Sequence, residues 1–210
     1  IDAPDGSKNL LIGRWENDWP TFVVISSKTL SEESRGYNGV PPGHTFVNGW
    51  TAMNRYDNFL TDLTGDGKKE IVSAINGTWN RITVYNEDGK PLFNAQIGPG
   101  VSGERTNIRM MDVGDIDEDG KQEIVVGLSS GFLNTLDDKT RKIWSELLPD
   151  SPTVVKIVNE HDFSWICAGC EDGTILALDK KGNIIREGKV KGRPNMIKSI
   201  KGVDGPITVI

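Results

Sequence analysis

The segment 115–123 carries the residue types and the spacing of a calcium-binding loop. It reads DIDEDGKQE, which places side-chain oxygens at positions 1, 3, 5 and 9 and a glycine at position 6. Calcium is a hard cation that takes about six to eight oxygen ligands, so alternate carboxylates on a tight turn can surround one ion. The candidate ligands are Asp115, Asp117, Asp119 and Glu123, together with the backbone carbonyl of Lys121.

This loop leads into a strand and not into a helix. An EF-hand loop needs a glutamate at position 12 and flanking helices. Here position 12 is Val126, and the residues after the loop are the apolar, β-branched types that favour strands. The pattern therefore predicts a calcium loop in a β context.

A second segment, 62–70, repeats the pattern with one carboxylate fewer. It reads DLTGDGKKE, so the candidate ligands are Asp62, Thr64, Asp66 and Glu70, with the backbone carbonyl of Lys68. Calcium affinity follows the number of charged ligands, so we expect weaker binding here. The alternative for both loops is an Asp-Gly turn whose acidic side chains are solvated and hold no metal.

The elements that must position these loops form a repeated unit of short strands. The second strand of the unit recurs at Leu10–Gly13, Ile71–Ala74, Ile124–Gly127, Ile166–Gly169 and Ile207–Ile210, and the third at Thr21–Ser26, Arg81–Asn86, Phe132–Asp137 and Thr174–Asp179. Hairpin signals such as Asp-Gly and Gly-Asn follow several of the third strands. Four short strands in about 40–45 residues are typical of a β-propeller blade. The repeat therefore predicts an all-β propeller of four-stranded antiparallel blades, with a β-sandwich as the alternative.

The repeat also suggests how the chain is divided. We expect a single β-propeller domain, or part of one, over residues 1–210, with a partial blade at 1–37, blades at about 51–98, 105–149 and 152–190, and a partial blade at 194–210. Propellers have typically four to eight blades. The sequence thus predicts a partial or larger ring of seven or eight blades, whose remaining blades belong to a larger chain.

Composition excludes several classes of function. The net charge is −6 and no basic patch with interleaved aromatics occurs, which argues against nucleic acid. No stretch has the length and apolar character of a membrane span. Cys167 and Cys170 lie in a predicted strand, where residues three apart point to opposite faces, so we expect buried core cysteines and no redox pair.

The phrases DLTGDGKKEIV and DVGDIDEDGKQEIVVG resemble FG-GAP repeats, also described as VCBS-like, which are the calcium-binding units of integrin alpha-chain propellers and of many bacterial secreted proteins. The resemblance implies that Ca²⁺ is the cofactor and that the ligands are the two sets given above. It also implies a structural role for the ion. An extracellular, cell-surface or periplasmic protein is expected, because millimolar calcium is available there.

Aromatic residues gather in the loops expected at the opposite end of the blades. Trp15, Trp19, Tyr37, Trp50 and Trp79 are the candidate ligand-binding residues. Aromatic faces stack on sugar rings, so this surface is a candidate for binding a glycan or a protein. The alternative is that these side chains cover blade edges.

We favour a non-enzymatic binding module over two enzymatic alternatives. Rhamnogalacturonan lyases are calcium-bearing propellers that are similar in the acidic loop, and a polysaccharide lyase would need a base and cationic help. His44, Arg55 and Tyr56 are the clustered candidates for those catalytic roles. The phrase DGTILALDKKGNII resembles quinoprotein-like dehydrogenase repeats, but the cofactor-facing residues of such enzymes are not evident.

Overall fold

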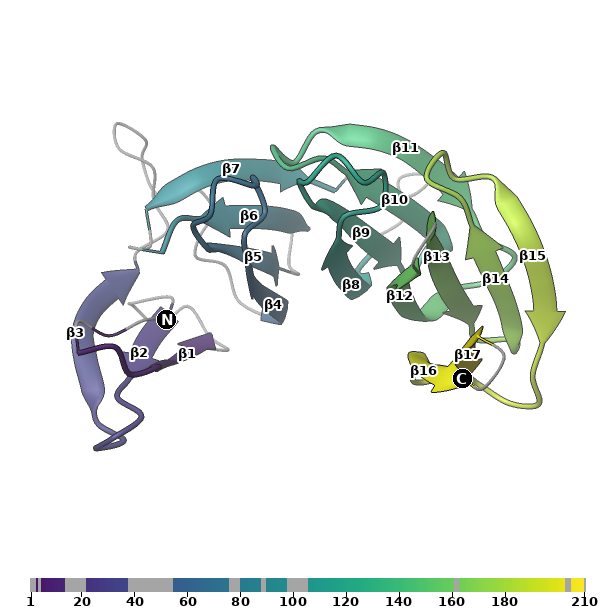
Figure 1. Cartoon of the computed structure of the whole chain (residues 1–210). Coiled ribbons are helices and arrows are strands. Elements are labelled where there is room, and N and C mark those ends of the chain that lie inside the picture. The colour runs from purple at the N-terminus through teal and green to yellow at the C-terminus, as the bar shows by residue number, and fades with distance from the viewer. Residues whose placement is uncertain are drawn as a thin grey trace. The chain divides into compact units, whose positions relative to one another are not determined.

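The computed structural model describes residues 3, 5–13, 22–37, 55–75, 80–87, 90–97, 106–160, 163–202 and 205–209. Within these ranges the regular elements are β-strands, as the repeat predicted (Figure 1). The described part of the chain contains no helix of the length and apolar character that crossing a membrane would need. The strands fall into two compact units: Ile1–Asp62 with Gly67–Ile97, and Leu63–Asp66 with Gly98–Ile210.

The first unit contains two antiparallel sheets. The three-stranded sheet has the order β1 (Leu10–Gly13), β2 (Phe22–Ile25) and β3 (Glu32–Tyr37). The four-stranded sheet has the order β4 (Arg55–Thr61), β5 (Glu70–Ile75), β6 (Arg81–Tyr85) and β7 (Pro91–Gln96). Val24, Ile71 and Tyr85 form a buried cluster, against which Leu11 and Leu60 pack, so an apolar layer joins the two sheets.

The second unit contains two four-stranded sheets and a hairpin, all antiparallel. The first sheet runs β8 (Ile108–Gly114), β9 (Glu123–Leu128), β10 (Phe132–Leu136) and β11 (Lys142–Leu147). The next runs β12 (Pro152–Glu160), β13 (Phe163–Cys170), β14 (Thr174–Leu178) and β15 (Ile184–Lys189). The hairpin pairs β16 (Lys198–Gly202) with β17 (Gly205–Val209). Within each sheet sequential strands are neighbours, which is the blade order that the repeat predicted.

Glycines near the end of the second strand of two blades, β9 and β13, allow the next segment to approach closely. A Cβ atom built on Gly127 would lie 2.8 Å from Cγ of Pro152, which begins β12. A Cβ atom built on Gly169 would likewise lie 2.8 Å from Cβ of Pro194. At both positions a larger side chain would separate the strand from the segment that covers it.

The core of the second unit lies between its two four-stranded sheets. Its buried members are Ile116, Val125, Leu133, Leu148, Val155, Ile157, Ile166, Ala168, Cys170, Leu176 and Leu178. Ile116 belongs to the acidic loop, so this loop is anchored in the core by its own apolar side chain. β8 and β12 lie side by side, and Lys156 Nζ on β12 donates a hydrogen bond to Asp112 Oδ1 on β8 at 2.8 Å (Figure 1).

Strand β13 holds the two cysteines on its opposite faces, as predicted. Cys170 packs into the core between the sheets, whereas Cys167 packs with Val158 and Ile197. Both thiols are free and buried. Burial raises the pKa of Cys167 to about 12 and that of Cys170 to about 11, so both side chains stay protonated and apolar in character.

Candidate metal centre

The acidic loop 115–122 connects β8 to β9 and is shaped by its own carboxylates. Asp115 Oδ1 accepts a hydrogen bond from the Glu118 N–H at 2.6 Å, and Asp115 Oδ2 accepts one from the Gly120 N–H at 3.0 Å. The chain turns at Glu118 and Gly120, whose φ angles are 66° and 87°. Glycine adopts this conformation without steric cost, which explains the glycine at position 6.

Three carboxylates of the segment 115–123 converge. Asp115, Asp117 and Glu123 each offer one oxygen atom, and these oxygens all lie within 4.8 Å of one another. In the described part of the chain this is the one such group of three or more acidic, histidine or cysteine side chains. Asp119 has a different contact, because its Oδ1 accepts a hydrogen bond from the Lys121 N–H at 2.8 Å.

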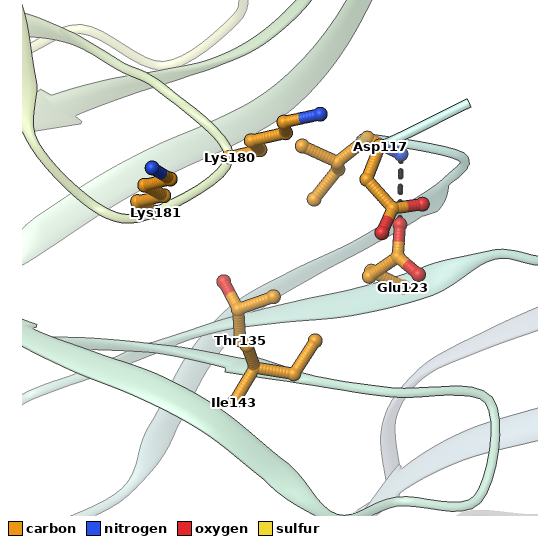
Figure 2. Close-up of a pocket in the computed structure, with 7 residues that line it drawn as sticks. Asp117, Glu123, Thr135, Ile143, Lys180 and Lys181 are labelled. Carbon is orange, nitrogen blue, oxygen red and sulfur yellow. Dashed lines mark hydrogen bonds between the residues drawn. The ribbon is translucent and has the colours of Figure 1, made fainter. Parts of the chain in front are cut away.

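Glu123 is the buried member of the group and its charge is poorly accommodated by the protein alone. Its carboxylate accepts a hydrogen bond from the Ile116 N–H at 2.8 Å (Figure 2). Burial above all, together with the nearby carboxylates of Asp117, Asp115 and Asp119, raises the pKa of Glu123 from 4.5 to about 7, against the opposing effect of that hydrogen bond. A carboxylate in such surroundings is stabilised by a cation.

The earlier acidic loop connects β4 to β5 and has a similar backbone but a looser set of acids. The Gly67 N–H donates to Asp62 Oδ2 at 2.8 Å, as the Gly120 N–H does to Asp115. Glu70 is buried like Glu123, whereas Asp66 is exposed. The acids of this loop do not form a converging group of three, and Thr64 stands where a carboxylate would complete it. Weaker calcium binding here stays a prediction.

Part of the earlier loop lies against the later one. The Gln122 N–H donates to the Leu63 carbonyl at 3.0 Å, and Leu63 is fully buried. A Cβ atom built on Gly65 would lie 2.6 Å from the carbonyl oxygen of Gly120. The segment Leu63–Asp66 therefore supports the backbone of the candidate metal loop within the second compact unit.

Both loops fall inside one stretch that resembles known proteins. Residues 62–126 match the FG-GAP-like repeat family model. This match confirms the FG-GAP repeat predicted from the two acidic phrases. No curated protein matches the sequence. The FG-GAP-like repeat comprises the second, third and fourth strands of one blade and the beginning of the next, with an acidic loop at either end.

Solved structures that resemble the chain carry propeller folds. BBS1N, in a crystal with ARL6DN soaked with lead, has a TM-score of 0.64 at 18% identity over 94% of this chain and 58% of its own. The Pan2 WD40 domain of Neurospora crassa has a TM-score of 0.53 at 15% identity, over 84% of this chain and 45% of its own. The V. cholerae biofilm matrix protein Bap1 has a TM-score of 0.50 at 16% identity, over 69% of this chain and 22% of its own. The chain thus spans less than two thirds of the length of these proteins. The likeness confirms the predicted fold class, an all-β propeller of four-stranded antiparallel blades.

The contact between the two loops of the FG-GAP-like repeat can be tested with a matched pair of glycine variants. Gly65 and Gly67 both have positive φ angles, but a Cβ on Gly67 meets nothing within 4 Å. We expect Gly65→Ala to lower the free energy of unfolding by about 2–3 kcal/mol and Gly67→Ala by about 1 kcal/mol. Urea unfolding of both variants measures the difference, and equal losses would contradict a supporting role for Gly65.

The predicted ligand-binding and catalytic residues are not placed by the structure. Trp15, Trp19, Trp50, Trp79 and His44 lie outside the described residues. Tyr37 is in β3, and Arg55 and Tyr56 are in β4, but their side chains also lie outside the described part of the chain. The aromatic surface and the catalytic alternative therefore stay predictions.

A pocket beside the metal loop was not predicted from the sequence. It has a volume of about 220 Å³ and is lined by Asp117 and Glu123 on one side and by Lys180 and Lys181 on the other (Figure 2). The lysines come from the turn between β14 and β15, in the neighbouring blade. The sequence signal for this site is weak, because a lysine pair is common in any solvated hairpin turn.

Proposed function

We propose that this chain is a calcium-stabilised β-propeller binding module that works in a calcium-rich environment outside the cytosol. One observation carries the proposal: three carboxylates converge in a segment inside an FG-GAP-like repeat. The ion would be held chiefly by Asp115, Asp117 and Glu123. Asp119 and the Lys121 carbonyl are the further ligands that the sequence predicts.

The donor set fits calcium. Calcium–oxygen distances are about 2.3–2.6 Å, so two ligands of one ion lie at most about 5 Å apart. The three carboxylate oxygens meet that condition, being within 4.8 Å of one another. The set contains oxygen donors alone, with neither histidine nor cysteine, which favours a hard cation over zinc.

The role that this arrangement supports is structural. The loop joins two strands of one blade, and its Ile116 is part of the core between two sheets. A cation neutralises clustered carboxylates that otherwise repel one another, and its binding free energy adds to the free energy of folding. The ordered loop then also fixes the neighbouring loop through the Leu63–Gln122 hydrogen bond.

A partner of this module is proposed to be a protein or a glycan. Among the similar structures, BBS1N is seen in complex with ARL6DN, and Bap1 is a biofilm matrix protein. These facts concern those two proteins, which share only the fold with this chain. An extracellular, cell-surface or periplasmic location is proposed because weak calcium sites are filled where calcium is millimolar.

Calcium titration of the purified chain tests the site. We expect calcium to raise the melting temperature, since a ligand at about a hundred times its Kd adds about 2.7 kcal/mol of stability. Asp117→Asn is the informative variant, because Asp117 is exposed and the loop-shaping hydrogen bonds go to Asp115, Asp119 and Glu123. This variant should fold but should lose most of the calcium-dependent stabilisation.

Glu118→Gln is the matched control. Glu118 is exposed and lies in the same loop, but it is not part of the converging group. Its replacement removes the same charge and should leave calcium binding nearly unchanged. An equal loss of calcium-dependent stabilisation in both variants would mean that calcium binding depends only on the net charge of the loop. The absence of any calcium-dependent heat or melting shift would refute the proposal.

A further inference from the structure

The pocket beside the metal loop has walls of opposite charge from two neighbouring blades. Asp117 comes from the loop that joins β8 to β9, Glu123 is the first residue of β9, and Lys180 and Lys181 come from the turn between β14 and β15. Figure 2 shows the Lys180 ammonium group extending along the pocket toward Asp117. The two groups do not form an ion pair, so the space between them is available to a small molecule.

The turn that presents the lysines is held in place by the facing blade. The Trp144 Nε1–H, on β11, donates a hydrogen bond to the Lys180 carbonyl at 2.9 Å. Gly182, with φ at 86°, sits against the same indole, and a Cβ there would lie 2.9 Å from the ring. Within the turn, Asp179 Oδ1 accepts a hydrogen bond from the Lys181 N–H at 2.8 Å. The backbone of the lysine pair is therefore fixed relative to the metal loop.

A buried hydroxyl group points into this pocket without a partner. Thr135, on β10, is 1% exposed, and its Oγ1 finds no hydrogen-bond partner in the part of the chain that the structure describes. Figure 2 shows this oxygen directed into the space between the lysines and Ile143. Buried hydroxyls are nearly always hydrogen-bonded, so an unpartnered one in a pocket wall indicates that a bound polar group completes it.

The charge of the pocket depends on the loop 115–123. The carboxylates of Asp117 and Glu123 repel an anion, but a calcium ion held by them neutralises that repulsion. The positive charges of Lys180 and Lys181 then determine the net charge of the pocket, and they favour an oxyanion such as a carboxylate. Ile143 adds an apolar wall that is 53% exposed and suits the C–H groups of a small polyol.

We infer that this pocket binds a small hydroxy-carboxylate, and that calcium in the loop 115–123 enables it to do so. The carboxylate lies at the lysine pair, a ligand hydroxyl completes the hydrogen bonding of Thr135, and the carbon skeleton packs on Ile143. This inference rests on the calcium site proposed above. It adds a ligand class that the calcium site by itself does not specify.

Calorimetric titration of the whole chain tests this inference, with D-glucuronate as the probe and D-glucose as the uncharged match. In millimolar calcium we expect glucuronate to bind at least about tenfold more tightly than glucose. Without calcium the glucuronate affinity should fall by a similar factor. Inorganic phosphate is the third arm, and phosphate binding as tight as that of glucuronate would overturn the assignment to a hydroxy-carboxylate.

Three variants separate the pocket from general charge effects. Lys180→Glu should weaken glucuronate binding by about tenfold or more, and Thr135→Val, which keeps the shape of the side chain, by several-fold. Lys191→Glu is the control. Lys191 is exposed like Lys180, but it follows β15 and does not line the pocket. A similar loss in Lys180→Glu and Lys191→Glu would overturn the inference.

Calcium binding measured on the same samples distinguishes the two proposals. If calcium binds and glucuronate does not, the hydroxy-carboxylate site is refuted while the calcium-stabilised module stands. If calcium fails to bind, the proposed function itself is refuted. Glucuronate binding that is equal with and without calcium would refute the dependence on the metal loop.

Discussion

Asp112→Ala is expected to lower the free energy of unfolding by about 2–4 kcal/mol. Asp112 is 3% exposed on β8 and accepts two hydrogen bonds from β12, one from Lys156 Nζ at 2.8 Å and one from the Ile157 N–H at 2.7 Å. The alanine variant loses a charge-assisted contact and leaves the buried Ile157 N–H without its acceptor. Urea unfolding measured by fluorescence gives the loss directly.

Two controls separate the effect of burial from that of charge. Asp112→Asn keeps an oxygen that can accept from the Ile157 N–H, so it should cost less than the alanine variant. Glu171→Ala removes an exposed carboxylate that lies 3.7 Å from Arg193, and we expect a change of at most about 0.5 kcal/mol. If Asp112→Ala lowered the free energy of unfolding as little as Glu171→Ala does, the packing of the two blades would not depend on the hydrogen bonds of Asp112.

The calcium-free protein is expected to lose stability as the pH rises from about 5 to about 7. The folded state holds the Glu123 proton up to about pH 7, whereas the unfolded chain releases it near 4.5. Between these values the folded state binds more protons, so the free energy of unfolding falls with pH, by about 3 kcal/mol in all. Asp172, whose pKa is lowered by hydrogen bonds from the Thr174 N–H and hydroxyl, titrates below this range.

Calcium is expected to reverse this pH dependence. Metal binding needs the ionised carboxylate, so stabilisation by calcium should increase over the same pH range in which the metal-free protein weakens. Urea unfolding at pH 5, 6, 7 and 8, with and without calcium, measures both trends. Glu123→Gln should flatten both of them. A pH dependence that persists in this variant would assign the effect to another group.

The metal loop was the part of the site most accessible to sequence reasoning. Its candidate ligands lie within nine consecutive residues, so their spacing alone indicates that they can converge, and Asp115, Asp117 and Glu123 do so. The strands were predictable for a similar reason, because short apolar runs recur along the chain and hairpin signals follow several of them. The reason for the glycine at position 127 could not be predicted, because it lies in the close approach of Pro152 from the next blade.

Features that join neighbouring blades could not be predicted in this way. Asp112 and Lys156 are 44 residues apart, and no local pattern pairs them. The one hint in the sequence is that Asp112 interrupts the apolar residues Met110, Met111 and Val113. Thr135 and Lys180 likewise line one pocket only because two blades are neighbours, and a strand pattern does not say which residue of the next blade each side chain will face.

The two buried thiols have a practical consequence for following the dynamics of this fold. Alkylating reagents react with the thiolate, which is scarce when the pKa is about 12 at Cys167 and about 11 at Cys170. Because β13 is an inner strand of its sheet, modification must wait until that sheet opens. The native cysteines are thus internal reporters of local unfolding, and labelling rates would follow the opening of this blade without any engineered probe.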